Sequence, residues 1–112
     1  MNKICTSIEQ SKKLIALGID VNTADMYYDC NSYGIQGKPE VAVGTVWSKD
    51  IPAWSLAALL GVMKEPELIR NSEGKWLIRV WYYSYPYSKG CYDDSVDACV
   101  DMIEKLHELN KL

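Results

Sequence analysis

The chain has 112 residues, of which 48% are hydrophobic and 24% are charged, and its formal net charge is −3. This length fits one domain, so we expect residues 1–112 to form a single domain. The near-average composition excludes disordered and collagen-like chains, and the excess of acidic residues gives no general attraction to nucleic acid or anionic membranes. Composition alone does not specify an activity.

The N-terminal segment has no hydrophobic run long enough for a secretion signal, and it meets an acidic residue at Glu9. No segment approaches the roughly 18 apolar residues of a membrane-spanning helix. We therefore expect a cytoplasmic protein that does not associate with membranes. Because cytosolic thiols stay reduced, we expect four free cysteines, namely Cys5, Cys30, Cys91 and Cys99.

The first predicted helix covers residues 7–17. Thr6 and Glu9 have the spacing of a capping box, in which the side chain of each residue accepts from the backbone N–H of the other. Gly18 follows at the position where a residue in the left-handed conformation commonly ends a helix. The helical spacing predicts an inward-facing stripe of Ile4, Ile8, Ser11 and Ile15.

Two strands are predicted next. Residues 26–30 are rich in aromatic side chains, and residues 41–47 alternate between a bulky face and a face of small side chains. The segment between them, residues 31–39, contains two glycines and a proline and predicts a loop. The small face of the second strand indicates that another element packs closely over it.

A second helix is predicted over residues 52–62. Pro52 fits the first turn of a helix, because its missing N–H would have no partner there. Since residues 51–63 carry no charge, we expect this helix to be buried on most sides and to form the centre of the core.

Two short apolar segments flank Asn71 and Gly74, which predicts a hairpin. Its second strand is expected to cover residues 75–83. Pro86 and a turn at residues 88–90 are expected to end the strand, so that the next two residues form at most a short edge strand.

A third helix is predicted over residues 95–110, from Asp94 as the N-cap and from apolar residues at helical spacing. The predicted order of elements is therefore α-β-β-α-β-β-α. Because the connections are short, we expect an α+β fold, in which one mainly antiparallel sheet of four or five strands packs against the three helices.

Few residues suggest catalysis. His107 is the only histidine, and eight residues, about 12 Å along one helix, separate it from Cys99. An enzyme would therefore need His107 to meet another cysteine or a carboxylate in space. The cysteines lack the close spacing of zinc ligands, and no glycine-rich phosphate-binding motif occurs. We expect neither a metal nor a cofactor, and we assign no catalytic residue.

Carboxylates cluster around the start of the third helix. They fit a divalent-cation site, or they complement the helix dipole on a solvated face. The second interpretation is favoured. The cluster consists of Asp93, Asp94, Asp97 and Asp101.

The aromatic strand is the unusual feature of the chain. Seven of the 12 aromatic residues (4 Trp and 8 Tyr) fall within residues 76–92. Strand alternation places one apolar face toward the core and leaves a second face that is aromatic and cationic rather than polar. That second face carries the candidate binding residues Arg79, Trp81, Tyr83 and Tyr85.

Three interpretations of this face are open. It is covered by a helix or loop of the same chain, it binds another protein or a second copy, or it stacks the bases of single-stranded nucleic acid. Arg, Trp and Tyr are the residue types that dominate protein-binding surfaces. Base stacking also requires nearby positive charge, which is mild in this region, so nucleic acid is the least favoured partner.

Two segments resemble small proteins of gut bacterial genomes and their prophage-like elements. They are KICTSIEQSKKLI at residues 3–15, with similarity up to residue 26, and DIPAWSL at residues 50–56, with similarity up to residue 60. A weaker likeness occurs at residues 96–98. No activity is assigned to that family, so the resemblance implies a shared fold and an accessory or phage-associated role, and it transfers no catalytic residues.

The sequence thus predicts a non-enzymatic accessory protein that acts through contacts with another protein or with itself. Single-stranded nucleic-acid binding and a small enzyme that uses His107 remain the alternatives.

Overall fold

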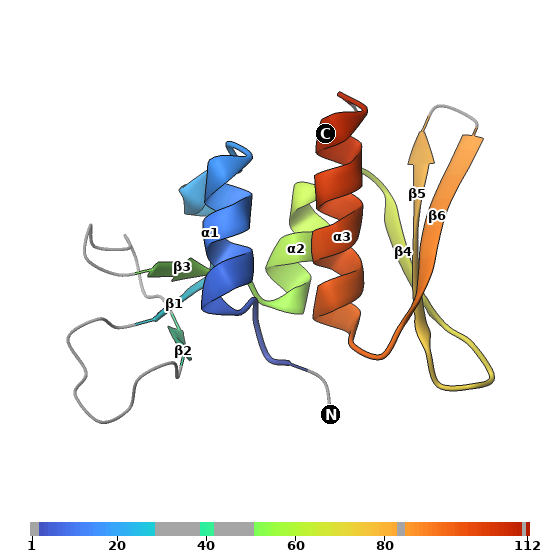
Figure 1. Cartoon of the computed structure of the whole chain (residues 1–112), viewed down its shortest axis with the longest axis horizontal. Helices are drawn as coiled ribbons and strands as arrows, with labels where there is room; N and C mark the ends of the chain where they lie inside the picture. The colour runs from blue at the N-terminus through green and yellow to red at the C-terminus, as the bar shows by residue number, and fades with distance from the viewer. Residues whose placement is uncertain (1–2, 29–38, 42–50, 83–84, 111) are drawn as a thin grey trace.

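In the part of the chain that the structure describes, three α-helices lie between two small antiparallel sheets (Figure 1). The computed structural model describes residues 3–28, 39–41, 51–82, 85–110 and 112, and for 39–41, 82 and 85–90 it describes the backbone alone. The elements are α1 (Ile8–Ala16), the 3-10 turn η1 (Val21–Thr23), β1 (Met26–Tyr28), β2 (Pro39–Val41), β3 (Ile51–Ala53), α2 (Leu56–Val62), β4 (Pro66–Arg70), β5 (Trp76–Tyr82), β6 (Tyr85–Tyr92) and α3 (Ser95–Glu108).

The predicted α+β class and the approximate order of elements are confirmed, but the single sheet of four or five strands is wrong. The described strands form two sheets, with strand orders β2-β1-β3 and β4-β5-β6. The first sheet packs on α1 and the second on α3, so the helices are covered from two sides (Figure 1). No helix within the described residues has the length and hydrophobicity needed to cross a bilayer.

The capping box of α1 lies one residue later than predicted. Ser7 is the N-cap, its Oγ accepts from the Gln10 N–H at 3.1 Å, and the Gln10 side chain accepts from the Ser7 N–H at 2.9 Å. The hydroxyl of Thr6 is used elsewhere, because it accepts from the Trp54 N–H at 3.0 Å and lies 2.7 Å from the Ser11 hydroxyl. Tertiary hydrogen bonds therefore decide which hydroxyl caps this helix.

The predicted inward stripe of α1 is confirmed at Ser11 and wrong at Ile4 and Ile15. Ile4 is 66% exposed and Ile15 is 40% exposed, whereas the buried residues of the helix are Ser11 and Leu14. The polar Ser11 can be buried because Thr6 supplies its hydrogen bond. Gly18, at φ +90°, follows the helix in the left-handed conformation, as predicted.

The second helix begins later than predicted, at Leu56. Pro52 lies in β3, an edge strand, where a missing N–H leaves the ladder intact. Ser55 is the N-cap, and the Asp25 carboxylate accepts from its N–H at 2.9 Å and from its hydroxyl. The predicted burial on most sides is confirmed in part: Leu59 is fully buried and four further residues of α2 are half-buried against the core, whereas Ala57 and Gly61 are exposed.

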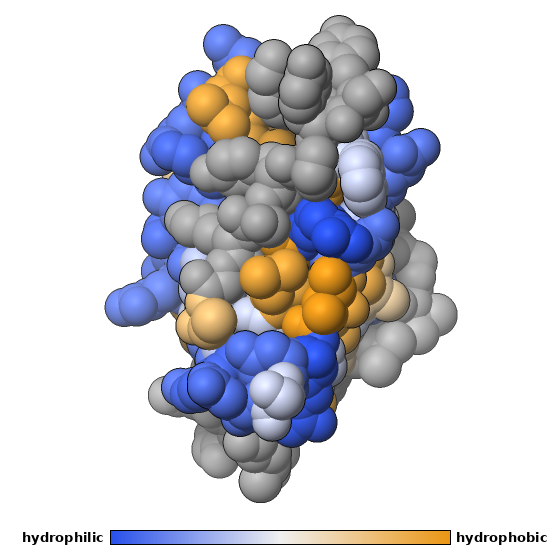
Figure 2. All heavy atoms as spheres, turned by 90° about the vertical axis from the view of Figure 1, so that its right-hand side faces the viewer, coloured by the Kyte–Doolittle hydropathy of each residue, from blue (hydrophilic) through white to orange (hydrophobic). Residues whose placement is uncertain are grey.

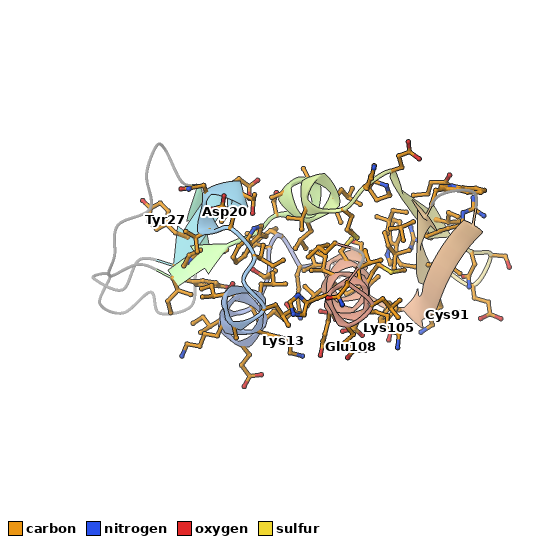
Figure 3. All side chains as sticks on the ribbon, turned by 90° about the horizontal axis from the view of Figure 1, so that it is seen from above. Lys13, Asp20, Tyr27, Cys91, Lys105 and Glu108 are labelled. Atoms are coloured by element: carbon orange, nitrogen blue, oxygen red, sulfur yellow. The ribbon has the colours of Figure 1, made fainter. Side chains whose placement is uncertain are left out.

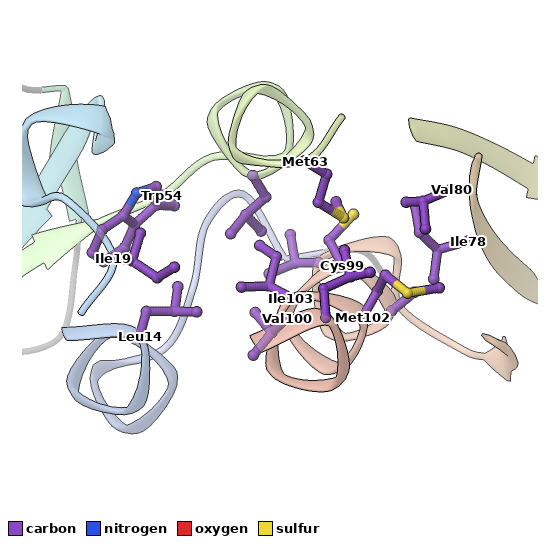
Figure 4. Packing of buried hydrophobic residues seen from close by; sticks show 14 residues of the cluster. Leu14, Ile19, Trp54, Met63, Ile78, Val80, Cys99, Val100, Met102 and Ile103 are labelled. Carbon is purple, nitrogen blue, oxygen red and sulfur yellow. The ribbon is translucent and has the colours of Figure 1, made fainter. Parts of the chain in front are cut away.

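The main core runs from α1 through α2 and α3 to the second sheet (Figure 4). Helix α3 contributes more of it than any other element, with seven of the 14 buried residues of this cluster. Trp54, fully buried just before α2, donates its indole N–H to Thr23 at 2.8 Å. Met102 points toward Ile78 and Val80 of β5, which fixes the face of the second sheet that meets α3 (Figure 4).

The predicted hairpin is confirmed as β4 and β5. The Asn71 side chain accepts from backbone N–H groups across the loop, and Gly74, at φ +80°, takes a conformation that disfavours other residues. The predicted end of the second strand near residue 83 is confirmed, since β5 ends at Tyr82, but the predicted turn at residues 88–90 is wrong, because a further strand, β6, runs from Tyr85 through Pro86 to Tyr92. An edge strand tolerates proline, since one side of its ladder has no partner to lose. Of the predicted strand at residues 41–47, positions 42–47 lie outside the described residues.

Asp94 is the predicted N-cap of α3, and it makes a cap that a mutation can test. Its carboxylate accepts from the N–H of Val96 at 2.8 Å, of Asp97 at 3.2 Å and of Lys3 at 2.6 Å. We expect Asp94→Ala to lower the free energy of unfolding by about 1–2 kcal/mol, measured by urea denaturation. Asp101→Ala on the same helix is the control and should change it by less than about 0.5 kcal/mol. Equal losses in the two variants would contradict the capping role.

Candidate interaction surface on the second sheet

The second sheet has one face on α3 and one face turned away from the helices. Ile78 and Val80 are at most 2% exposed and belong to the core. Because side chains alternate along a strand, Leu77, Arg79 and Trp81 project to the opposite side. We call this side the outer face. Its described side chains are Glu67 and Ile69 of β4 and Leu77, Arg79 and Trp81 of β5.

None of the described helices lies over the outer face. Helices α1 and α3 run side by side, and α2 lies behind them, all on one side of the β4-β5-β6 sheet (Figure 3). Ile69 and Leu77 stand directly opposite each other in the ladder, are half-buried and belong to neither buried cluster of the described residues. Figure 2 shows hydrophobic side chains gathered near the middle of this side of the molecule, with hydrophilic ones above and below them.

Three side chains of the outer face form one polar cluster. The Arg79 Nε donates to Glu67 Oε2 at 3.0 Å, and a second guanidinium nitrogen donates to the same oxygen. The Trp81 indole N–H donates to Glu67 Oε1 at 2.6 Å. The guanidinium carbon of Arg79 lies 5.4 Å from the centre of the Trp81 ring, within range of a cation–π contact. The carboxylate therefore fixes both the arginine and the tryptophan.

The structure brings together two of the four predicted site residues. Arg79 and Trp81 are adjacent on the outer face and half-buried. Tyr83 lies outside the described residues, and Tyr85 is described by its backbone alone, as the first residue of β6 opposite Tyr82. Sequence reasoning missed Glu67, although extending the predicted hairpin ladder away from its turn pairs this residue with Arg79.

The Glu67 carboxyl should titrate below its usual range. Hydrogen bonds from Arg79, and then from Trp81, lower the pKa of this carboxyl. A lowered pKa means that the stabilisation is present above the ordinary value, about 4.3, and is lost as the pH falls through the pKa of the folded state. We expect the indole N–H resonance of Trp81 to shift as this carboxyl is protonated, with a midpoint below about 4.3. The Trp76 indole is the control in this NMR titration, and a Trp81 midpoint at or above 4.3 would contradict the cluster.

The geometry offers little to an enzyme that uses His107. The imidazole is exposed near the end of α3, and it makes no hydrogen bond or ion pair with the described residues. Two thiols are buried, and burial raises the pKa of Cys99 to about 12 and also raises the pKa of Cys5. Cys91 is exposed, and Cys30 lies outside the described residues. The described thiols and His107 thus form no recognisable catalytic pair.

Three of the four carboxylates near the start of α3 have protein partners. Asp94 caps the helix, Asp97 pairs with the Lys3 ammonium at 2.7 Å, and Asp93 pairs with Lys75. Within the described residues, no group of three or more potential ligands could hold a metal ion. These contacts agree with the favoured interpretation of the cluster, in which the acidic side chains complement the helix dipole on a solvated face.

Comparisons of the chain with protein-family models, with curated proteins and with solved structures find no match. The candidate surface therefore rests on the sequence and geometry of this chain.

Proposed function

We propose that the chain is a non-enzymatic binding protein that contacts a protein partner through the outer face of the β4-β5-β6 sheet. One observation carries the proposal: Ile69, Leu77 and Trp81 lie together on a sheet face that none of the described helices covers. An antiparallel sheet that only faces water normally presents polar side chains there. Tryptophan and arginine are also the residue types most enriched at energetically important interface positions.

The polar cluster favours a protein partner over single-stranded nucleic acid. A base-stacking platform needs cations that are available to the phosphates. Arg79 is instead bound by Glu67 of the same chain, so a phosphate would have to displace a carboxylate already in place. A protein surface can complement this neutral pair without breaking it.

The cellular role remains part of the same proposal. The likeness of residues 3–26 and 50–60 to small gut-bacterial and prophage-associated proteins supports a cytoplasmic accessory role. Those segments include α1 and most of α2, which lie away from the outer face. The resemblance therefore supports the proposed fold and cellular role, and the outer face supports the proposed binding of a protein partner.

Affinity purification with surface variants tests the proposal. Trp81→Ala and Leu77→Lys each remove a hydrophobic contact from the outer face, and we expect each to reduce the amount of associated protein at least about tenfold. Ile15→Lys is the matched control, because Ile15 is an exposed hydrophobic residue of α1 on another side of the molecule. If the outer-face variants retain their associated proteins as fully as the control does, the proposal is wrong.

A further inference from the structure

We propose that the partner of the outer face is a second copy of this chain, packed face to face about a two-fold axis. The inference rests on the proposed function and names its partner. It follows from three features of the second sheet: its edges disfavour strand addition, its outer face is self-complementary in charge, and the ladder places the complementary residues opposite each other.

Both edges of the sheet carry features that oppose the addition of another strand. The edge strand β6 contains Pro86 and Lys89, and its ladder with β5 is irregular at Leu77. The other edge, β4, has only five residues and begins with Pro66, directly after Glu65 at φ +48°. Proline, lysine, irregular pairing and short length are the usual protections of an exposed edge. Association is therefore expected on the face of the sheet.

The charges of the outer face suit a copy of itself. Its described charged residues are one acid, Glu67, and one base, Arg79, with exposed side-chain fractions of 41% and 35%. These two described charges cancel, whereas the whole chain carries −3. Two identical acidic chains repel each other least where such cancelling charges meet, and a face that contains both signs can pair with its own copy.

The strand register defines the arrangement. Glu67 pairs with Arg79 across β4 and β5, and Ile69 pairs with Leu77. A two-fold axis parallel to the strands and midway between β4 and β5 exchanges the positions of the two strands. It therefore sets Glu67 over the partner's Arg79 and Ile69 over the partner's Leu77. The two sheets then pack with aligned strands, one of the two usual ways for sheets to pack.

The size of the sheet predicts a reversible dimer. Three strands about 4.8 Å apart, with about 3.4 Å per residue, cover on the order of 300 Å². Stable complexes bury about 800 Å² per partner. We therefore expect a dimer that dissociates on dilution.

Sedimentation velocity of the purified chain at a series of concentrations tests the inference. The wild type should show a monomer–dimer equilibrium, and Leu77→Lys should weaken association at least about tenfold. Ile69→Lys should weaken association to a similar extent, and Ile15→Lys should not change it. Circular dichroism should show that all variants are folded. A chain that is monomeric at every concentration overturns the inference, but the proposed function stands if Leu77→Lys still loses an associated protein. If the chain forms a dimer whose affinity neither Leu77→Lys nor Ile69→Lys changes, both the inference and the role of the outer face in binding are wrong.

A charge exchange tests the two-fold arrangement itself. The double variant Glu67→Arg with Arg79→Glu keeps the ion pair within each chain but removes the acceptor of the Trp81 N–H, so it should still associate with itself, more weakly than the wild type. Mixed with the wild type, it places like charges opposite each other, so mixed dimers should form at least about tenfold less than by chance. Free mixing of the two forms would overturn the arrangement. A different protein with fixed charges would instead lose affinity for the exchanged chain.

Discussion

Replacing Trp54 with alanine is expected to lower the free energy of unfolding by about 3–5 kcal/mol. The side chain is fully buried where the segment before α2 meets η1 and the end of α1, and its indole N–H donates to Thr23. The substitution removes the packing of the largest fully buried side chain in the described residues and leaves a cavity. Urea denaturation followed by circular dichroism measures the change.

Two further variants separate packing from hydrogen bonding at this position. Trp54→Phe keeps most of the buried surface and loses the indole N–H, so we expect a smaller loss than for alanine. Thr23→Val removes the acceptor and should cost about 1–3 kcal/mol, because it leaves the indole N–H without a partner. A Trp54→Ala protein as stable as the wild type would contradict the position of this residue in the core.

The second large effect on stability is expected at β5, where two adjacent residues point to opposite faces of the sheet. Ile78 is fully buried against α3, whereas Leu77 lies on the outer face. We expect Ile78→Ala to lower the free energy of unfolding, measured by denaturation, by about 2–5 kcal/mol. Association of the folded protein, measured by sedimentation, should not weaken. Leu77→Ala should cost less than about 1.5 kcal/mol and should weaken association.

This comparison tests which face of the sheet is the core, since the two residues are adjacent and nearly equal in size. A larger loss of stability for Leu77→Ala than for Ile78→Ala would reverse the assignment of the two faces. Loss of association in both variants, with both folded, would indicate that the two effects are not separable by face.

Local signals in the sequence predicted the elements that local chemistry determines. Asp94 lies at a helix start, its carboxylate accepts from two N–H groups of the first turn, and it caps α3 as expected. Asn71 and Gly74 have few alternatives to a tight hairpin loop, and that hairpin is present. In each case the residue satisfies backbone groups within a few positions of itself, so no knowledge of the tertiary structure was needed.

The errors arise where a residue suits two structures and a distant contact decides between them. Thr6 and Ser7 can both cap α1, and the buried bond from Trp54 to the Thr6 hydroxyl leaves the cap to Ser7. Pro52 fits the first turn of a helix and also an edge strand, and pairing with β1 selects the strand. The first sheet has the same cause, because β1 pairs with β3, a strand that lies beyond β2 in the sequence.

The candidate surface was predictable in part. Alternation along β5 was enough to place Arg79 and Trp81 on a face away from the core. Glu67 belongs to another strand, and its role depends on the register of the hairpin and on two hydrogen bonds to the same carboxylate. A residue whose role depends on a neighbour in the next strand can therefore be found from the sequence only after the register of the two strands has been predicted.

Methyl cross-saturation NMR tests the central claim most directly, because it locates the contact surface residue by residue. In a mixture of labelled and unlabelled chains at high concentration, we predict saturation transfer to the methyl groups of Ile69 and Leu77. The buried Ile103 and the exposed Ile15 should show none. Transfer concentrated on Ile15, or on any surface other than the outer face, would contradict the account.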